Sequence, residues 1–404
     1  MFRATTPDSA KILDNSPGRQ PASKPGPLAG LTIIEMAGLG PAPLAALMLS
    51  EMGARVVRIE RMASGKAFLA LPPEHDLDRH GRSILKLDLK RPEGIALVLR
   101  LLEKADVLIE GFRPGVMERL GLGPEESQRR NPKLIYARMT GFGQQGPLAG
   151  RAGHDLTYLA YSGVLHAIGP SDGKPVPPLN LVADYGGGAM FLIAGILAAL
   201  FETSRSGKGQ VVDAAMVDGA SMLAAPFFSF MAAGFWTDRR GSNLLDSGAP
   251  FYDTYRTADG KHVAVACLEP QFFAEFAKLL PLEQRFAAAQ YNRSMWDGMR
   301  EAITRRIAEK TRDEWAALFE NTDACVAPVL SFSEAPQHPH NLARGVHVKA
   351  GALERPAPAP RFSRTPSATA APPAADEATA AVLERLGIAP DDIEALAKAG
   401  IVGR

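Results

Sequence analysis

The sequence predicts an α/β protein in two parts, a doubly wound parallel sheet followed by a smaller α+β domain. From Leu31 to about residue 140, short apolar runs alternate with helical stretches, as in a parallel sheet that helices cover on both faces. After Gly248 the pattern changes to two period-2 strands around Asp259-Gly260, which is a β-hairpin signal. The first part therefore has the Rossmann-like arrangement, and the second part is a separate, smaller fold.

The elements of the first part follow one another in short units. Strands are expected at 31–37 (LTIIEMA), 54–60 (ARVVRIE), 106–110 (DVLIE) and 133–139 (KLIYARM). Helices are expected at 43–53, ending at a glycine, and at 92–105, starting with the Pro-Glu pair that suits a first helical turn. The apolar run at 189–201 is too short to span a bilayer, so we expect a buried core helix there.

Composition shifts divide the chain into four segments. Residues 1–26 contain no apolar signal-type stretch and are expected to form a disordered tail. The large α/β domain spans 27–235, and the small α+β domain spans 236–333, with helices expected at 294–310 and 311–322. The last segment, 334–404, contains a Pro/Ala-rich connector and then an amphipathic helix pair, and it is expected to return to the large domain.

Composition also excludes several classes of partner. The 45 basic and 44 acidic residues give a formal net charge of +1, so there is no basic excess with which to hold a nucleic acid or a membrane surface. We expect neither partner. Two cysteines, Cys267 and Cys325, without a CxxC spacing, predict no disulfide framework, no metal site and a cytoplasmic location.

Basic residues stand at the ends of several expected strands, namely Arg61, Lys90, Arg113 and Arg138. In a doubly wound sheet the ligand crevice lies beyond the carboxyl ends of the strands. Arg61 and Arg113 follow their strands directly, so they are expected to face one another across that crevice and to suit a phosphate-rich ligand. For any single arginine, a solvated surface charge is the simpler interpretation. The glycine-rich turn at 37–43 is not G-x-G-x-x-G, and a tight packing turn is favoured over a dinucleotide site.

Three acids and a histidine are candidates for proton transfer, and each also has a plain structural interpretation. Asp155 precedes a helical stretch and is expected to cap that helix. His154 is its neighbour, but adjacent side chains diverge, so the two are not expected to pair. Asp184 lies before three glycines, where it would cap a helix or have its pKa shifted by an apolar setting. Glu269 ends the second hairpin strand, which Pro270 stops, so its carboxylate is expected to project from the strand end.

Considered together, these segments resemble one family, the α-methylacyl-CoA racemases of the class III CoA-transferase (CaiB/BaiF) superfamily. The resemblance runs from about Pro27 to Arg364 and rests on many long motifs in one order. Among them are LTIIEMAGLGPAPLAALMLSEMGARVVRIER, LIEGFRPGVMERLGLGP, AGHDLTYLAYSGVL, PPLNLVADYGGGAMF, GAPFYDTYRTADG and LEPQF.

The resemblance implies inversion of the carbon next to the thioester carbonyl of a 2-methylacyl-CoA. No separate cofactor is needed, because coenzyme A enters as part of the substrate. His154, paired with Glu269, would be the base for one enantiomer and Asp184 the acid on the opposite face, while Asp155 would help to form an oxyanion cradle. It also implies an interlocked homodimer in which the small domain delivers Glu269. The residues assigned to coenzyme A are Arg61, Leu87, Asp88, Leu89, Lys90, Gly111, Phe112, Arg113, Arg119, Gly153, Leu156, Thr157 and Tyr158.

Two alternatives remain open at this point. Class III CoA-transferases use an aspartate that aligns with Asp155 as a nucleophile, although they typically lack the preceding histidine and the glutamate of the EPQ motif. A non-catalytic acyl-CoA-binding protein would keep the arginines and would not need His154, Asp184 and Glu269 together. The acyl-chain preference is not predicted.

Two departures from the family pattern stand out. Residues 62–86 are longer and less typical than in the family. Ser247 replaces a usual glycine, which would restrict the backbone if φ there is positive.

Overall fold

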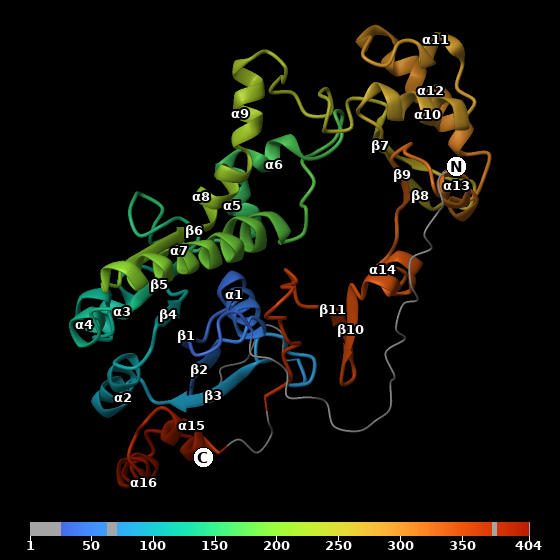
Figure 1. Ribbon diagram of the computed structural model, residues 1–404. Coiled ribbons are helices and arrows are strands. Elements are labelled where there is room, and N and C mark those ends of the chain that lie inside the picture. The colour runs from blue at the N-terminus through green and yellow to red at the C-terminus, as the bar shows by residue number, and fades with distance from the viewer. Residues whose placement is uncertain (1–25, 63–70, 374–377, 404) are drawn as a thin grey trace, which may run out of the picture.

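The computed structural model describes residues 26–62, 71–373 and 378–403 (Figure 1). The expectation of a disordered tail at 1–26 falls, apart from Gly26, outside the described residues. Figure 1 shows a large domain and a smaller domain at the upper right, joined by extended segments.

The large domain is built on a parallel sheet of six strands in the order β3-β2-β1-β4-β5-β6. The strands are β1 (Thr32–Met36), β2 (Arg55–Arg61), β3 (Arg82–Leu87), β4 (Val107–Glu110), β5 (Ile135–Thr140) and β6 (Val211–Ala215). The parallel sheet is confirmed, and so are the four strands that the sequence patterns predicted. The patterns missed β3 and β6, which form the two edges and are only partly buried. In this strand order the ligand crevice opens between β1 and β4, where the direction of winding reverses.

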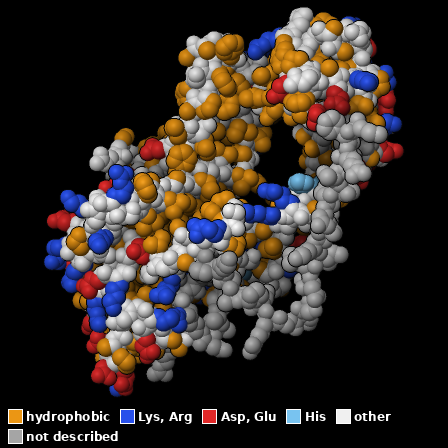
Figure 2. Space-filling model, in the orientation of Figure 1, with side chains coloured by type: hydrophobic (Ala, Val, Ile, Leu, Met, Phe, Trp, Pro, Cys, Tyr) orange, Lys and Arg blue, Asp and Glu red, His pale blue; other side chains and the backbone are white. Residues whose placement is uncertain are grey.

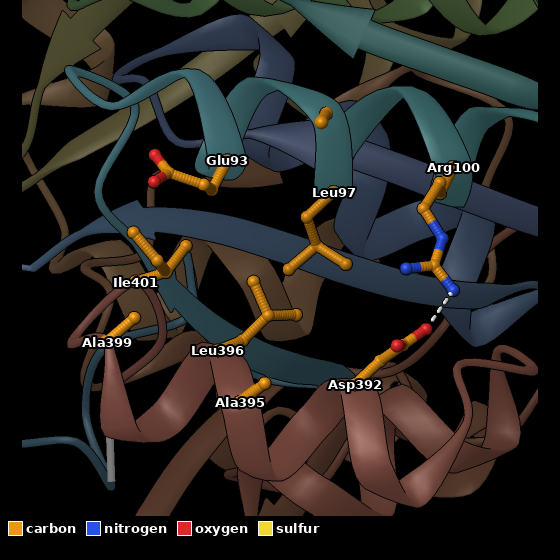
Figure 3. Close-up of a pocket in the computed structure, with 9 residues that line it drawn as sticks. Glu93, Leu97, Arg100, Asp392, Ala395, Leu396, Ala399 and Ile401 are labelled. Atoms are coloured by element: carbon orange, nitrogen blue, oxygen red, sulfur yellow. Dashed lines mark hydrogen bonds and ion pairs between the residues drawn. The ribbon is translucent and has the colours of Figure 1, made fainter.

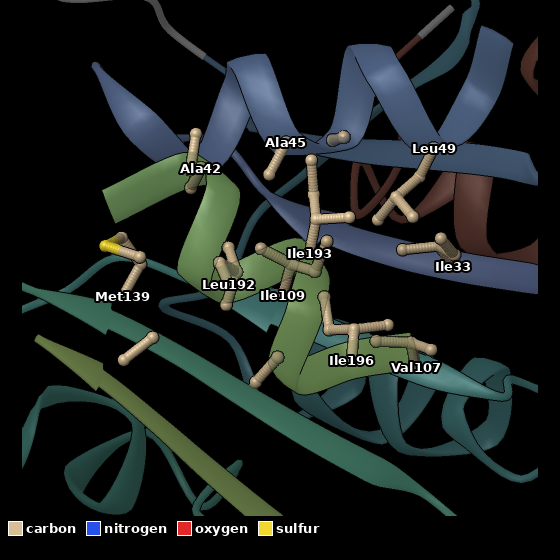
Figure 4. Packing of buried hydrophobic residues seen from close by; sticks show 14 of the residues in the cluster. Ile33, Ala42, Ala45, Leu49, Val107, Ile109, Met139, Leu192, Ile193 and Ile196 are labelled. Carbon is tan, nitrogen blue, oxygen red and sulfur yellow. The ribbon is translucent and has the colours of Figure 1, made fainter. Parts of the chain in front are cut away.

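Successive residues of the central strands supply two separate cores. Ile33 on β1 belongs to one apolar cluster and Ile34 to the other, because neighbouring side chains of a strand point to opposite faces. On the first face, α1 (Pro41–Glu51) and α7 (Met190–Ser206) pack over the sheet, and Figure 4 shows their side chains meeting those of the strands. On the second face lie α2 (Pro92–Leu102), α15 (Thr379–Arg385) and α16 (Pro390–Lys398). The sheet is therefore covered on both sides, as predicted.

The helix at the predicted core run is longer than expected. A π-helix, η1 (Leu181–Ala189), continues directly into α7, so that Leu181–Ser206 forms one helical stretch of 26 residues with a hydropathy of 1.7. In the described part of the chain it is the one helix long and apolar enough to cross a membrane by length and composition. One side, with Leu192, Ile193 and Ile196, packs into the core, whereas Phe201 is exposed. The predicted core helix is thus buried along one side only.

The remaining helices of the large domain are short. They are α3 (Val116–Arg119), α4 (Pro124–Arg130), α5 (Asp155–Ser162), α6 (Val164–Ala167), α8 (Met216–Leu223) and α9 (Ala225–Ala232). Of these, α5 and α8 pack against η1. None of the residues of α9 is buried, although its sequence is APFFSFMA.

The small domain has its own antiparallel sheet and its own aromatic core. β7 (Tyr252–Arg256) and β8 (His262–Ala266) form the predicted hairpin, with Gly260 at a positive φ of 79°, and β9 (Val326–Pro328) pairs with β8. The helices are α10 (Pro270–Leu279), α11 (Gln284–Ala287), the 3₁₀ turn η2 (Arg293–Met295), α12 (Trp296–Ile307) and α13 (Arg312–Phe319). Ser247, at the entrance to this domain, has a φ of 67°, so the substitution of the usual glycine does place a side chain in the left-handed region.

The C-terminal segment crosses from the small domain to the large one. It contains η3 (Ala335–Gln337), α14 (Pro339–Arg344) and the hairpin of β10 (His347–Ala350) with β11 (Leu353–Pro356), before α15 and α16. Arg355 forms a buried ion pair with Glu51 at the end of α1, at 2.5 Å. The Gly81 amide donates to the carbonyl of Ala371 at 2.7 Å. These contacts hold the Pro/Ala-rich stretch against the large domain.

Candidate active site

Two arginines flank the carboxyl end of the central strand. Arg61 is the last residue of β2, and Arg113 follows β4 after Gly111 and Phe112. Because β1 lies between β2 and β4, the two arginines follow the strands on either side of its end. Both side chains are exposed and could meet a ligand.

Arg138 does not belong to this crevice, which corrects the prediction from its position at a strand end. It is buried on β5, donates to Glu110 at 2.9 Å, and also pairs with Glu118 at 2.8 Å. Glu110 and Arg138 are register partners on β4 and β5, so the pair neutralises a buried carboxylate inside the sheet. Its role is structural.

The first turn of α5 presents His154 to solvent and buries Asp155. The amide of His154 donates to the Thr157 hydroxyl at 3.0 Å, and that hydroxyl donates back to the His154 carbonyl at 2.7 Å. Thr157 thus fixes the entry of the chain into the helix, and the His154 side chain remains exposed. Asp155, the first helical residue, is only 5% exposed.

Asp155 does not cap its own helix, which corrects the sequence interpretation. Its Oδ2 accepts hydrogen bonds from the amides of Ala183 and Asp184, at 2.8 and 2.9 Å. The carboxylate therefore caps the first turn of η1, a segment that follows it in the sequence after two intervening loops. Its second oxygen, Oδ1, is buried and has no hydrogen-bond partner among the described residues.

Asp184 lies within the π-helical turn, and its carboxyl group is half-buried. Burial raises its pKa, and the negative charge of Asp155 adds to this. A hydrogen bond from Asn180 Nδ2 to its Oδ2, at 3.3 Å, and the nearby His154 act in the opposite direction. The structure therefore brings Asp184, Asp155 and His154 near one another, and Asp184 holds a proton more readily than an ordinary aspartate.

Glycines let the backbone of η1 approach its neighbours. A Cβ on Gly187 would lie 2.5 Å from the Ala220 amide nitrogen, and one on Gly219 would lie 1.9 Å from the Gly187 carbonyl oxygen. Gly40, with a φ of 76°, ends the turn after β1, and a Cβ there would lie 3.5 Å from Asp184 Oδ2. The glycine-rich turn is thus a packing turn, as expected, and it also lies beside the carboxyl group of Asp184. π-Helical turns are often found at functional sites.

Tyr158 on α5 lies between the acid cluster and Arg113 in its electrostatic interactions. Its ring packs onto Gly153 and Gly141, where added Cβ atoms would lie 2.5 and 2.1 Å from Tyr158 Cε1. Burial, followed by the charge of Asp184, raises the pKa of Tyr158 to about 12, whereas Arg113 lowers it. Tyr158 therefore interacts electrostatically with both the proposed acid, Asp184, and a proposed coenzyme A contact, Arg113.

Three of the residues assigned to coenzyme A line one surface pocket. Leu89, Lys90 and Arg119 surround a cavity of about 670 Å³ together with residues at the start of α2. Asp88 lies beside it, and its Oδ1 accepts from the Lys90 amide at 3.0 Å. This pocket and the exposed Leu156 and Thr157 are open to a ligand.

Two of the assigned residues are constrained by the fold. Leu87 is only 1% exposed, and its side chain belongs to the core under α2, so only its backbone could meet a ligand. The amide of Phe112 already donates to Glu110 Oε2 at 2.7 Å.

Glu269 lies apart from the other candidates. It is exposed at the N-terminus of α10 in the small domain, where it raises the pKa values of Tyr291 and Cys325 in addition to the effect of their burial. Within the described residues the structure shows no hydrogen bond or ion pair of its side chain, and none to His154. Figure 2 shows an open gap between the two domains. A single chain therefore does not bring Glu269 to the cluster on α5 and η1.

Two residues that support Glu269 were missed by the sequence analysis. Gln290 is buried, and its Nε2 donates to the carbonyls of Cys267 and Leu268, at 3.0 and 2.8 Å. The Tyr291 hydroxyl also donates to Leu268. These bonds fix the backbone just before Glu269. They come from a loop without motif character, so no sequence signal could have found them.

Metal ligands and disulfides do not contribute to this cluster. In the part of the chain that the structure describes, no group of three His, Cys, Asp or Glu side chains could hold a metal ion. Cys267 is buried and Cys325 exposed, and neither is in a disulfide.

Comparison with known proteins places this fold and site in a family. Residues 28–379 match CoA-transferase family III, and the chain belongs to that family. It is 46% identical to α-methylacyl-CoA racemase of Mus musculus over 370 residues, covering 91% of this chain and 95% of the relative. The human protein of the same name is 44% identical with the same coverage. A solved CaiB/BaiF family protein from Brucella suis superposes with a TM-score of 0.76 at 26% identity, covering 90% of this chain and all of the other.

Proposed function

We propose that the protein is a 2-methylacyl-CoA racemase, which interconverts the (2R) and (2S) thioesters through an enolate. The observation that carries the proposal is the tethering of Asp184 to Asp155 beside His154, where the sheet opens between β1 and β4. The similarity to racemases from mouse and human supports it.

The proposed reaction needs two groups that exchange one proton each with the α-carbon. One group removes the α-proton, the carbon–hydrogen electron pair moves into the thioester carbonyl, and the other group returns a proton to the opposite face. A group with a pKa near the working pH does this best, contributing about 10²–10⁴-fold. The raised pKa of Asp184 suits this role, with His154 as its counterpart. No redox cofactor is required, since no electron leaves the substrate.

The proposed enolate carries negative charge on the former carbonyl oxygen. The N-terminus of α5 begins at Asp155, so the positive end of its dipole faces this region. The two exposed arginines beyond β2 and β4, with Lys90 and Arg119 at the neighbouring pocket, would hold the phosphate groups of coenzyme A.

We further propose that the active unit is a homodimer in which Glu269 of one chain pairs with His154 of the other. Apolar side chains that a single chain leaves exposed support this idea: Met222 is 63% exposed, Phe228 59% and Met231 41%. Figure 2 shows apolar side chains gathered over α8 and α9, at the edge of the gap between the domains. A second copy would cover this surface and fill the gap.

Co-expression of Asp184→Asn and Glu269→Gln chains tests the shared site. Each proposed site combines Asp184 of one chain with Glu269 of the other. In a mixed dimer, one site therefore contains both substitutions and the other site contains neither. Random pairing should therefore restore roughly a quarter of the wild-type activity, although each parent is nearly inactive. Activity no higher than that of the parents would show that each site uses its own chain's Glu269.

The proposed racemisation itself is tested in deuterated water. A (2R)-2-methylacyl-CoA should lose its α-hydrogen to solvent and its stereochemical purity together. Transfer of coenzyme A between acyl acceptors without exchange would instead establish a CoA-transferase.

One observation favours that second function, since Asp155 Oδ1 is buried and has no partner among the described residues. Such an oxygen could attack a thioester. Trapping an acyl group or coenzyme A on Asp155 with hydroxylamine or borohydride would establish the transferase. Its absence under turnover, with α-exchange present, would leave Asp155 as the anchor of Asp184.

A further inference from the structure

The last residues of the described chain pair with the outer edge of the sheet. The Asp88 amide donates to the Ile401 carbonyl, and the Gly403 amide donates to the Lys86 carbonyl, both at 3.0 Å. Leu87 and Val402 form an antiparallel bridge between them. Since β3 is the edge strand, this short segment satisfies backbone groups that no other strand reaches.

The two C-terminal helices hold this segment in place. Ile401 and Val402 are 0% and 3% exposed, so the pairing segment is also anchored by its side chains. The Thr379 hydroxyl at the start of α15 donates to the Gly403 carbonyl at 2.8 Å, and Arg91 donates to the Ala399 carbonyl at 2.9 Å.

Figure 3 shows α16 lying across α2, with Leu97 and Leu396 facing one another between the two helices. An ion pair between Arg100 and Asp392, at 2.8 Å, closes one end of this contact. The chain end is therefore attached to α2 as well as to β3.

These contacts converge on the loop that joins β3 to α2. Residues 86–91 carry the bonds to Ala399, Ile401 and Gly403, and the same loop supplies Leu89 and Lys90 to the pocket of about 670 Å³ that also includes Arg119. One side of the loop is bound by the chain end, while the other faces the pocket. The same residues thus connect the C-terminal segment to the lining of the pocket.

We propose that residues 399–403 are a positioning element for the coenzyme A subsite at residues 87–91. The family match ends at residue 379, so this element lies outside the part of the chain by which the family is recognised. The inference rests on the proposed function for the identity of the ligand. The inference predicts that loss of residues 399–403 weakens the binding of coenzyme A. The proton-transfer cluster on α5 and η1 should be unaffected by that loss.

A truncation that removes residues 401–404 tests this inference. Free coenzyme A is titrated into wild-type and truncated protein by calorimetry, and kcat and KM are measured with a 2-methylacyl-CoA. We expect Kd and KM to rise about tenfold, because the loop loses its preorganisation, while kcat stays within about twofold. A chain lacking Arg404 alone is the matched control and should bind coenzyme A like the wild type.

The possible outcomes separate the inference from the proposed function. Unchanged coenzyme A affinity in a folded truncated protein would overturn the inference, as would an equal loss of kcat. No binding of coenzyme A by the wild type would overturn the proposed function and the inference with it. If the truncated chain does not fold, Gly403→Pro removes the amide that bonds to Lys86 and places a Cβ 3.0 Å from Lys86 Cβ, and it should still raise Kd by about threefold. An unchanged Kd in that variant contradicts the proposal.

Discussion

The two parts of the proposed active site are held in different ways. On the large domain, Asp184 is half-buried, its amide is bound by Asp155, and its carboxyl group accepts from Asn180. On the small domain, Glu269 is exposed at a helix start, and the described residues give its side chain no hydrogen bond.

The large domain therefore preorganises its acid, Asp184, whereas the small domain does not preorganise Glu269. The environment of Asp184 is complete within one chain, and it already raises the pKa of that carboxyl group. For Glu269, the described residues fix only the backbone just before it, through Gln290 and Tyr291, so the proposed pairing with His154 needs a second chain.

The largest effect is expected for Asp184→Asn, which removes the ionisable group from the preorganised part. Racemisation should fall by about 10²–10⁴-fold in both directions, because the equilibrium constant between the epimers does not change. Solvent exchange of the α-hydrogen on the face that His154 serves should persist, as measured by proton NMR in deuterated water. Loss of that exchange as well would show that the two groups do not act on separate faces.

A smaller effect is expected for Gln290→Leu, which acts on the small-domain part through the backbone. The Cys267 carbonyl loses its donor, whereas the Leu268 carbonyl keeps the Tyr291 hydroxyl. An unsatisfied buried group costs about 1–3 kcal/mol of stability. We expect α-hydrogen exchange on the His154 face to fall about tenfold and exchange on the Asp184 face to be unchanged. Tyr291→Phe is the control, since it removes one bond and leaves Gln290 in place. An equal decrease on both faces would indicate a general loss of structure.

The pH dependence should separate the two faces. Burial raises the pKa of Asp184, so exchange that needs its ionised form should decline as the pH falls through a midpoint above the value of about 3.9 for an exposed aspartate. Asn180→Ala removes a hydrogen bond that lowers this pKa, so the midpoint should move further up. A downward shift would show that Asn180 does not stabilise the charged form.

The smallest effect is expected at Ser247, at the entrance to the small domain. Its φ of 67° lies in the left-handed region, so Ser247→Gly should relieve strain and change stability by no more than about 1 kcal/mol. Arg300 donates to the backbone carbonyl at this position, and that bond does not depend on the side chain. Chemical denaturation measures the effect. A clear destabilisation would mean that the serine hydroxyl makes a contact that outweighs the strain.

Local sequence signals were sufficient for much of the fold. The hairpin at Asp259-Gly260 and the four inner strands follow from patterns within a few residues of one another, and the structure confirms them. The edge strands β3 and β6 were not predicted, because exposed positions interrupt their apolar runs.

In the site, by contrast, contacts between distant segments could not be predicted from local sequence patterns. Asp155 looked like a helix cap because that is the local interpretation of an aspartate before an apolar stretch. Its actual donors are the amides of Ala183 and Asp184, which only the folded chain brings close. Arg138 was misplaced for the same reason, since Glu110 and Glu118 come from other elements. The roles of His154, Asp184 and Glu269 came from the family resemblance and remain predictions.

The π-helical turn at Leu181–Ala189 has a consequence for how the sequence can change. Each residue of an ordinary helix advances the side chains by about 100°, so a single-residue deletion after Asp184 would rotate α7 relative to that aspartate by this amount. Either the carboxyl group would leave the cluster or the apolar side of α7 would leave the core. We therefore expect substitutions to be accepted on the exposed side of this helix, but insertions and deletions of one residue to abolish activity. The length of the turn is as much a part of the proposed catalytic apparatus as the acid it carries.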